Sequence, residues 1–212
     1  MNIRGGWAEV RTGPVPNIAP LLHDSFRNGG RQLTAGSSIR PMTERRWRPV
    51  NGPSGFSGTV HRIGSDEAIG FFGMTPRGAG VYNVAVLLAH EKDWRAGLGA
   101  DAMLALMKHM ALNEGARRFI LAAGIHNANT VRMLANGLVR PEALARTAIA
   151  DRRSLRDLVI GSISAEELGF SPDRTSVRDS AAEAAWSSAR RAVVDAIADR
   201  AMATEMRKGG ER

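Results

Sequence analysis

Two glycines, Gly97 and Gly99, have the residue type and position most suggestive of chemistry, because they lie between an apolar segment and a long amphipathic one. Glycine has no side chain to keep a ligand away from the backbone, and the first turn of a helix has N–H groups without intrahelical acceptors. A strand–glycine–helix junction therefore suits a phosphate group, which the helix dipole also attracts. A plain strand–helix junction can carry the same glycines, so the neighbouring elements must support this interpretation.

Three side chains near this junction could move protons. His90 and Glu91 directly follow the apolar segment Val81–Ala89, and His126 lies just beyond the apolar segment Arg118–Ala123. A general base typically contributes about 10²–10⁴-fold to such a reaction. We predict His90, Glu91 and His126 as catalytic candidates. The alternatives are a solvated loop pair for the first two and a structural histidine for the third.

An arginine-rich segment has two interpretations. It holds Arg40, Arg45, Arg46 and Arg48 around Trp47. It is either a solvated loop or one wall of a site for a second substrate. Arginine beside tryptophan also suits contact with nucleic-acid phosphates and bases. The formal net charge of +8 favours an anionic ligand without deciding between a nucleotide cofactor and a nucleic acid.

The elements that must position these residues follow from the spacing of apolar residues. Strands interspersed with helices imply an α+β sheet covered on both faces. The predicted strands are Trp7–Thr12, Thr59–Ile63, Ala68–Met74, Val81–Ala89, Arg118–Ala123, Ala143–Ala150 and Leu155–Ile163. The predicted helices are one that begins near Pro16 and includes Phe26, a short turn at Thr43–Trp47, and the segments Gly97–Glu114, Thr130–Asn136 and Asp179–Lys208.

The glycine junction resembles the acetyl-CoA pyrophosphate loop of the GNAT acetyltransferases, in particular their ribosomal-protein N-terminal acetyltransferase branch. That branch often shows Trp-Gly-x-Gly-Tyr-Ala, and Trp94-Arg95-Ala96-Gly97-Leu98-Gly99 is similar, with arginine in place of the first glycine. The sequence Asn127-Ala128-Asn129-Thr130 resembles the Asn-x-x-Ser that precedes the next helix of the branch. Residues Arg146, Asp157 and Leu158–Ile163 resemble features of its last two strands, so the resemblance covers about Arg11 to Leu168.

The resemblance implies a GNAT fold, with a mixed, mostly antiparallel sheet of about seven strands that is splayed at its centre around CoA. It also implies direct transfer of an acetyl group from acetyl-CoA to a protein N-terminus or a small-molecule amine. The backbone of the strand end would bind the pantetheine arm, the glycine loop would bind the pyrophosphate, and the Leu88 N–H would polarise the thioester carbonyl. The implied cofactor-binding residues are Leu87, Leu88, Ala89, Trp94, Arg95, Ala96, Gly97, Leu98, Gly99, Ala100, Asn127 and Thr130.

Some features depart from the family pattern. Many members place a tyrosine on the helix after the second central strand, where it protonates the departing thiolate, but the one tyrosine of this chain is Tyr82. The sequence Asn136-Gly137-Leu138-Val139 stands where many members have a Gly-Phe pair, and the tail beyond Phe170 has no counterpart. A rival interpretation is therefore a catalytically inactive GNAT-like binding or structural protein that contacts nucleic acid through its basic loop.

Composition and segment boundaries complete the sequence-based expectations. We predict a GNAT acetyltransferase domain at residues 1–170, followed at 171–212 by a linker and an amphipathic helix that packs on this domain or forms a homodimer. The absence of cysteine excludes disulfides and thiolate metal sites, and it permits a reducing, cytoplasmic location. No metal site is expected. No secretory signal is expected, because Met1 to Arg11 contain no apolar region, and no membrane span is expected, because no apolar stretch reaches about 20 residues.

Overall fold

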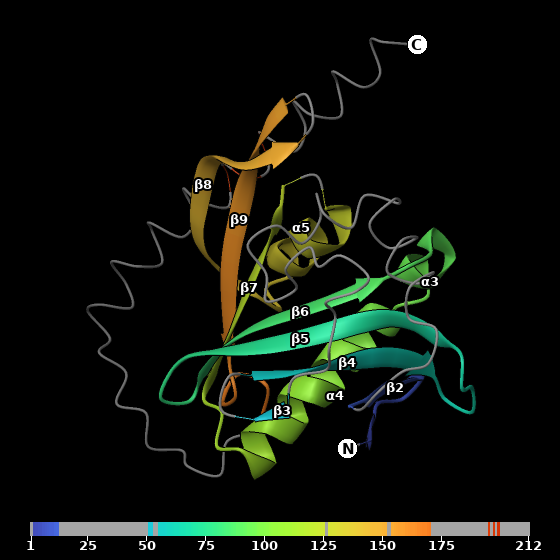
Figure 1. Ribbon diagram of the computed structural model, residues 1–212. Helices are drawn as coiled ribbons and strands as arrows, with labels where there is room; N and C mark the ends of the chain where they lie inside the picture. Colours follow the sequence, from blue (N-terminus) through green and yellow to red (C-terminus); the bar gives the residue numbers. More distant parts are fainter. Residues whose placement is uncertain are drawn as a thin grey trace.

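The structure is a computed structural model that describes residues 2–12, 51–52, 55–125, 127–151 and 154–170, together with Asp195, Ile197 and Asp199. The helix predicted near Pro16, the arginine-rich segment, His126 and most of the predicted C-terminal helix lie outside the described residues. Figure 1 shows a curved sheet with a long helix across one of its faces.

Nine strands form one sheet among the described residues, in the order β1-β2-β4-β5-β6-β7-β9-β8, with β3 paired to β4. All neighbouring strands are antiparallel except β6 and β7, which are parallel. The strands are β1 (Asn2–Arg4), β2 (Ala8–Arg11), β3 (Asn51–Gly52), β4 (Gly55–Arg62), β5 (Ala68–Gly78), β6 (Val81–Leu88), β7 (Arg118–Gly124), β8 (Arg140–Asp151) and β9 (Ser154–Ser164). The helices described along their whole backbone are α3 (Glu91–Arg95), α4 (Leu98–Asn113) and α5 (Ala128–Ala135).

The expected α+β architecture is confirmed, but the strand number is higher than the predicted seven or so. The predicted first strand, Trp7–Thr12, corresponds to β2, and the structure adds the short partners β1 and β3. Neither segment is long enough to show a recognisable alternation of apolar residues. The short helix α3 was also missed, because its single turn occupies five polar and aromatic residues that carry no apolar stripe.

Helix α4 packs against the apolar face of the sheet that carries Val60, Val86 and Leu88. Its sequence predicts this packing, since apolar residues recur at helical spacing along one side. The helix contributes Leu106, Met107 and Met110, each almost completely buried, to the central hydrophobic cluster. Burial of such side chains stabilises the fold by roughly 1.5–3 kcal/mol each. No helix within the described residues is long and apolar enough to cross a membrane.

One residue of the predicted C-terminal helix contacts the body of the protein. Ile197 has helical backbone geometry, is 3% exposed and belongs to the central hydrophobic cluster, whereas Asp195 and Asp199 on either side are exposed. This pattern agrees with the predicted amphipathic stripe at Ile197. The other stripe residues, Trp186 and Val193, lie outside the described residues.

Candidate functional site

The sheet is split between its two parallel strands. Strands β6 and β7 pair at Val81–Arg118, Tyr82–Phe119 and Asn83–Ile120, and no later pair joins them within the described residues. Both strands continue beyond this point, to Leu88 and Gly124, and Figure 1 shows them diverging towards α3 and α5. Among the described residues, no strand pairs with the two diverging edges on their facing sides, and such edges suit a ligand that can hydrogen-bond to extended backbone.

Backbone alternation identifies the β6 residues that face this splay. The Ala89 N–H donates to the Ile69 carbonyl at 2.9 Å, so the backbone of Ala89 is directed to β5. Because successive residues of a strand direct their backbone groups to opposite sides, those of Leu88 are directed towards β7. The same alternation directs Val86 and Val84 to the splay.

The alternation gives the three predicted pantetheine ligands different backbone directions. Of the three predicted pantetheine ligands Leu87, Leu88 and Ala89, Leu88 has its backbone towards the splay, whereas Leu87 pairs with Phe71 and Ala89 is bonded to Ile69. Sequence reasoning missed Val84 and Val86. Their alternation with Leu88 could have indicated them.

The N-terminus of α4 stands at the open end of β6. The first helical hydrogen bond runs from the Asp101 N–H to the Gly97 carbonyl at 3.0 Å, so the N–H groups of Leu98, Gly99 and Ala100 precede the helical ladder. The helix has 16 residues, and its dipole adds positive potential at this end. This geometry agrees with the predicted phosphate-binding junction, and we call Gly97 together with the N–H groups of Leu98, Gly99 and Ala100 the cradle.

The two glycines of the cradle have different physical roles. Gly97 is the N-cap of α4 and has a φ of 75°, a left-handed conformation that side chains disfavour, while a Cβ there would meet nothing within 4 Å. Gly99 lacks a positive φ, and its Cβ would contact Leu88 Cδ1 at 3.5 Å and Val86 Cγ1 at 3.9 Å. Gly97 therefore sets the backbone direction, whereas Gly99 lets the helix approach β6.

Helix α3 connects the strand end to the cradle through Trp94. The indole Nε1 donates to the Leu88 carbonyl at 2.8 Å, and the half-buried ring packs against the central hydrophobic cluster. The Leu88 carbonyl thus already accepts a hydrogen bond from Trp94, whereas the Leu88 N–H is directed to the splay. Of the other predicted loop residues, Ala96 is exposed and forms the C-cap of α3, while Arg95 has its backbone in α3 and its side chain undescribed.

Two aspartates flank the cradle. Asp93 on α3 is 2% exposed and pairs with Arg62 at the end of β4, and its second oxygen, Oδ2, has no hydrogen-bond partner within the described part of the chain. Leaving a buried carboxylate oxygen unpaired typically costs about 1–3 kcal/mol. Asp101 accepts hydrogen bonds from the N–H groups of Gly6 and Trp7 at 2.9 Å and of Ala8 at 2.8 Å. Asp93 thus joins α3 to β4, and Asp101 joins the start of α4 to the β1–β2 hairpin.

The protonation of Asp101 follows from these contacts. Burial of the carboxylate opposes ionisation, but the three N–H groups, led by that of Trp7, favour the charged form and give a net lowering of its pKa. Asp101 is therefore ionised at neutral pH.

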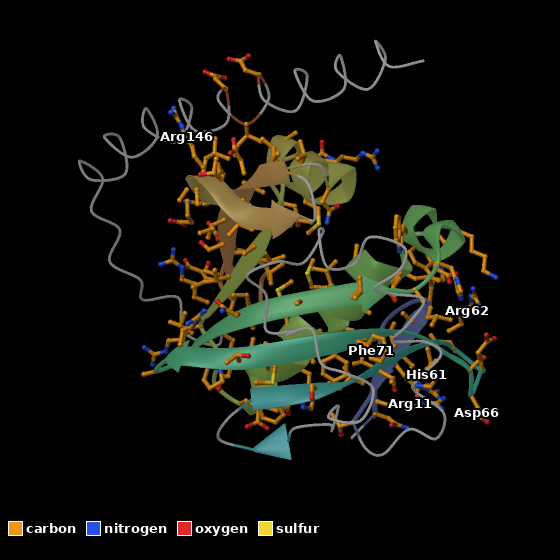
Figure 2. All side chains as sticks on the ribbon, turned by 45° about the horizontal axis from the view of Figure 1, so that its top comes forward. Arg11, His61, Arg62, Asp66, Phe71 and Arg146 are labelled. Carbon is orange, nitrogen blue, oxygen red and sulfur yellow. The ribbon has the colours of Figure 1, made fainter. Side chains whose placement is uncertain are left out.

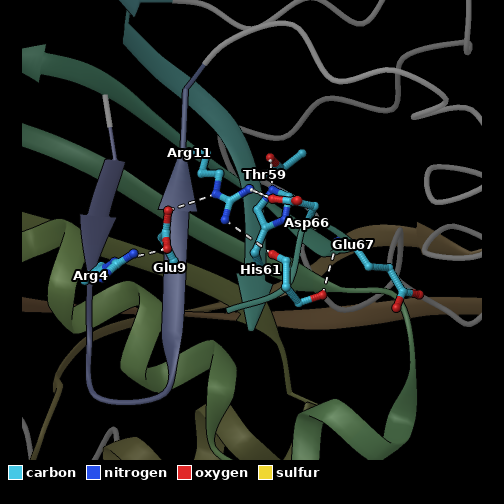
Figure 3. A network of polar contacts seen from close by, with 8 residues as sticks. Arg4, Glu9, Arg11, Thr59, His61, Asp66 and Glu67 are labelled. Atoms are coloured by element: carbon cyan, nitrogen blue, oxygen red, sulfur yellow. Dashed lines mark hydrogen bonds and ion pairs between the residues drawn. The ribbon is translucent and has the colours of Figure 1, made fainter. Parts of the chain in front are cut away.

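A polar network lies on the sheet face opposite α4 (Figure 3). The buried carboxylate of Glu9 accepts from Arg11 Nε at 2.8 Å and from Arg4 Nε at 3.2 Å, and Arg11 also pairs with Asp66 at 2.8 Å. The hydrogen bond from Arg11 outweighs burial and lowers the pKa of Glu9. Figure 2 shows Arg11 and Asp66 at one end of the sheet, while Arg146 lies at the other.

His61 belongs to the same face and was not predicted. Its Nε2 lies 2.8 Å from Thr59 Oγ1, and its buried Nδ1 has no hydrogen-bond partner within the described residues. Burial, reinforced by the positive charge of Arg11, lowers the pKa of His61, so the imidazole is neutral at pH 7. Alternating polar residues on β2 and β4 were the available sequence signal.

The predicted catalytic residues are only partly placed. His90 is half-buried and is the N-cap residue of α3, with its carbonyl accepting the Asp93 N–H at 3.0 Å. The backbone of Glu91 opens α3, but its side chain is not described, and His126 lies outside the described residues. The catalytic roles of all three remain predictions.

After the end of β7, Asn127 directly precedes α5. Its N–H donates to the Gly124 carbonyl at 2.8 Å, and its carbonyl accepts the Val131 N–H at 3.0 Å. A second helix N-terminus therefore lies at the end of the second diverging strand. The predicted ligand Thr130 is in the first turn of α5, with its side chain outside the described atoms.

Two further residues noted in the sequence have structural contacts. The Asp157 carboxylate accepts the Thr147 N–H at 2.9 Å inside the irregular part of the β8–β9 pair, which is a structural hydrogen bond. Thr147 has a φ of 49°. Among the described residues, it is the only residue other than glycine with a positive φ. Tyr82 pairs with Phe119 where β6 and β7 are joined, and its side chain packs against the central cluster.

The fold has many relatives among solved structures, although no known family model and no curated protein matches the sequence. A probable GNAT-family acetyltransferase from Chromobacterium violaceum is 20% identical, with a TM-score of 0.61 over 79% of this chain and 88% of that one. A GNAT-family acetyltransferase from Bacillus anthracis is 17% identical, with a TM-score of 0.62 over 79% and 100% of the two chains. The ribosomal L7/L12 alpha-N-protein acetyltransferase RimL, solved in complex with coenzyme A, is 14% identical, with a TM-score of 0.61 over 79% and 99%. The chain therefore has the fold of the GNAT acetyltransferases.

Proposed function

We propose that this protein is an N-acetyltransferase that takes an acetyl group from acetyl-CoA and transfers it directly to a primary amine. The observation that carries the proposal is the end of β6–β7 pairing after Asn83 and Ile120, with the N-terminus of α4 beside the open end of β6. The fold likeness to GNAT acetyltransferases supports the same reaction class.

The residues present fit acetyl-CoA. The pantetheine arm carries amides, which can pair with the backbone of Val84, Val86 and Leu88 as a strand would. The pyrophosphate would lie against the N–H groups of Leu98 to Ala100, where no Cβ at Gly97 intervenes. A charge-assisted hydrogen bond of this kind contributes about 1.5–3 kcal/mol, so a few of them suffice for micromolar binding.

The reaction needs little covalent help from the protein. The neutral amine nitrogen attacks the thioester carbonyl carbon, the C–S bond breaks, the amine loses a proton and the CoA thiolate gains one. The N–H of Leu88, which is directed to the splay, would stabilise the developing oxyanion. Positioning of the two substrates supplies much of the acceleration. His90 and Glu91, which follow the strand end in the sequence, are the first candidates for proton transfer, with His126 as the third.

We assign protein N-terminal amines as the first class of acceptor and small-molecule amines as the second. RimL, which shares the fold, acetylates the N-terminus of a ribosomal protein, as its name states, and this supports the first class. The net charge of +8 also suits an acidic protein or a ribosome as a partner.

Calorimetric titration with acetyl-CoA, followed by a thiol-release assay with peptide libraries and with amines, tests the proposal. We expect a single site with a 1:1 stoichiometry and release of free CoA that depends on an amine. A folded protein that binds no acetyl-CoA would contradict the proposal as a whole.

A second candidate function is acetyl-CoA binding without turnover. Tyr82 favours it, because this tyrosine packs at the closed end of the splay and cannot serve as the acid on the following helix that many GNAT enzymes use. Tight binding of acetyl-CoA with no CoA release on any amine would select this candidate. RNA binding that weakens steeply with salt would further indicate that the arginine-rich segment contacts nucleic acid.

A further inference from the structure

The cradle at the start of α4 is held by a contact with the first hairpin of the chain. The carboxylate of Asp101, in the first turn of the helix, accepts the N–H groups of Gly6, Trp7 and Ala8 within 2.9 Å. These residues form the turn and the start of β2 in the β1–β2 hairpin, more than 90 residues away in the sequence. One side chain therefore closes three hydrogen bonds between two distant segments.

The hairpin is shaped to admit this carboxylate. A Cβ at Gly5 would overlap the carboxylate atoms of Asp101, whereas a Cβ at Gly6 would lie at 3.5 Å from Asp101 Oδ1, an ordinary contact distance. The turn itself is closed by a hydrogen bond of 2.8 Å from the Gly5 N–H to the Ala8 carbonyl. A side chain at position 5 would therefore force the Asp101 carboxylate to move from its place in the turn.

The contact reaches the cradle through a single further hydrogen bond. The N–H of Asp101 donates to the carbonyl of Gly97, so the residue held by the hairpin also closes the first turn around Leu98, Gly99 and Ala100. The direction of those three N–H groups therefore depends on where the hairpin holds Asp101. On the other side of the cradle, Asp93 is held to β4 by Arg62.

We propose that Asp101 is a positioning residue, which orients the N–H groups of the α4 N-terminus for the pyrophosphate of CoA by binding the turn of the β1–β2 hairpin. The inference rests on the proposed function, because it names the phosphate-bearing ligand of the same site. In this proposal the hairpin affects ligand binding, whereas a purely structural contact would affect only stability. Binding of the phosphates depends on Asp101, and binding of the pantetheine arm at the splay does not.

The test compares two ligands on two variants. Dissociation constants are measured by calorimetry for CoA and for S-acetyl-pantetheine, which lacks the phosphates, with Asp101→Asn and Gly5→Ala. Asparagine keeps the shape of aspartate, but its amide group cannot accept all three hydrogen bonds. We expect CoA binding to weaken by about tenfold or more in both variants, and binding of S-acetyl-pantetheine to change by less than about twofold.

Gly6→Ala and Glu142→Gln serve as matched controls. The first adds the same methyl group to the same turn without overlap, and the second neutralises a carboxylate that pairs with Arg118 at 2.9 Å, where β6 and β7 are still joined. Both controls should bind the two ligands as the wild type does. Equal weakening of both ligands by Asp101→Asn, or unchanged CoA affinity in the folded variant, overturns the positioning role.

Amide hydrogen exchange of the wild-type protein tests the inference without a variant. If the hairpin and the cradle are coupled, CoA binding must stabilise the hairpin by the same free energy through which the hairpin aids CoA binding. CoA should then slow exchange at Gly6, Trp7 and Ala8, and S-acetyl-pantetheine should not. Protection by CoA at Leu98 to Ala100 alone overturns the inference but leaves the proposed function standing, whereas failure of the wild type to bind CoA overturns both.

Discussion

The indole Nε1 of Trp94 donates a hydrogen bond of 2.8 Å to the carbonyl oxygen of Leu88, and so joins helix α3 to the last residue of β6. This contact keeps one polar group of the strand end occupied and leaves the Leu88 N–H directed to the splay. It also fixes the path of the chain between the strand and the cradle.

Replacing Trp94 with phenylalanine should weaken acetyl-CoA binding more than it lowers stability. Phenylalanine keeps most of the packing but cannot donate to Leu88, and a hydrogen bond of this type contributes about 0.5–1.5 kcal/mol. We expect a dissociation constant raised by up to about tenfold, measured by calorimetry. Trp7→Phe is the control, since Trp7 is 68% exposed, and it should leave the constant unchanged. Equal effects of the two substitutions would contradict the role of the Trp94 contact.

The two glycines of the cradle should respond differently to substitution. Gly97→Val places a β-branched residue at a φ of 75°, which costs at least about 1–2 kcal/mol, and it should weaken acetyl-CoA binding by about tenfold or more. Gly99→Ala adds a methyl group at ordinary contact distance from Leu88 and should change binding by less than about threefold. Titrations beside thermal melts measure both. An unchanged affinity in folded Gly97→Val would remove the cradle from the cofactor site.

Stability should fall in acid partly through Asp101. Its pKa is lowered in the folded state, so its contribution is fully present above the unfolded-state pKa of about 3.9 and disappears as the pH falls through the lower folded-state value. Thermal melts between pH 3 and 7 should therefore show a smaller loss below about pH 4 for Asp101→Asn than for the wild type. Parallel curves for the two proteins would show that the carboxylate adds nothing to the acid sensitivity.

Replacing Thr147 with glycine should stabilise the protein. Threonine is β-branched and is held at a φ of 49°, a strain of roughly 1 kcal/mol or more that glycine does not have. The N–H that donates to Asp157 is kept. Denaturant unfolding should show a gain of up to about 1 kcal/mol. Thr75→Gly, in the regular part of β5, should instead lose stability, and a loss in both variants would refute the strain at Thr147.

The C-terminal segment should contribute to stability through Ile197. Ile197→Ala removes a side chain that is 3% exposed in the central cluster, and such a substitution typically costs about 2–5 kcal/mol. Asp195→Ala, on the exposed side, is the control. Melting temperatures measure both, and truncation after Phe170 should lower the melting temperature at least as much as Ile197→Ala. A truncated protein as stable as the full chain would make the segment a free appendage.

The sequence predicted the elements that have a clear apolar period and missed those that do not. Strand β6 was predicted as Val81–Ala89 and found at Val81–Leu88, and helix α4 was predicted as Gly97–Glu114 and found at Leu98–Asn113. Both elements are long; α4 buries one side, and β6 buries residues on both of its faces. The short β1, β3 and α3 depend on tertiary partners, so their local sequence carries little signal.

The sequence predicted which loop forms the candidate site, but it did not predict which backbone groups of β6 are directed to the splay. The Trp94–Gly99 segment indicated the cradle, since glycine and helix spacing are visible in a sequence. The direction of each β6 backbone group depends on its pairing with β5, which only the register reveals, and so Val84 and Val86 were missed. Asp101 was missed because its partners are more than 90 residues away in the sequence. His61 and Glu9 have partners two residues away on their own strands, but they were missed because the sequence does not show that the sheet buries these polar side chains.

The brief pairing of β6 with β7 has a consequence for how the chain folds. Strands β4, β5 and β6 are joined by short hairpin connections, and so are β8 and β9, so each of these two parts can assemble from contacts between near neighbours. Strand β7 pairs with β9 and joins the first part through three residue pairs with β6, which become available only after the α4 crossover is in place. A ligand bound in the splay would supply the hydrogen bonds that β6 and β7 do not make to each other. Association of β6 with β7 and binding of the ligand would then be thermodynamically coupled.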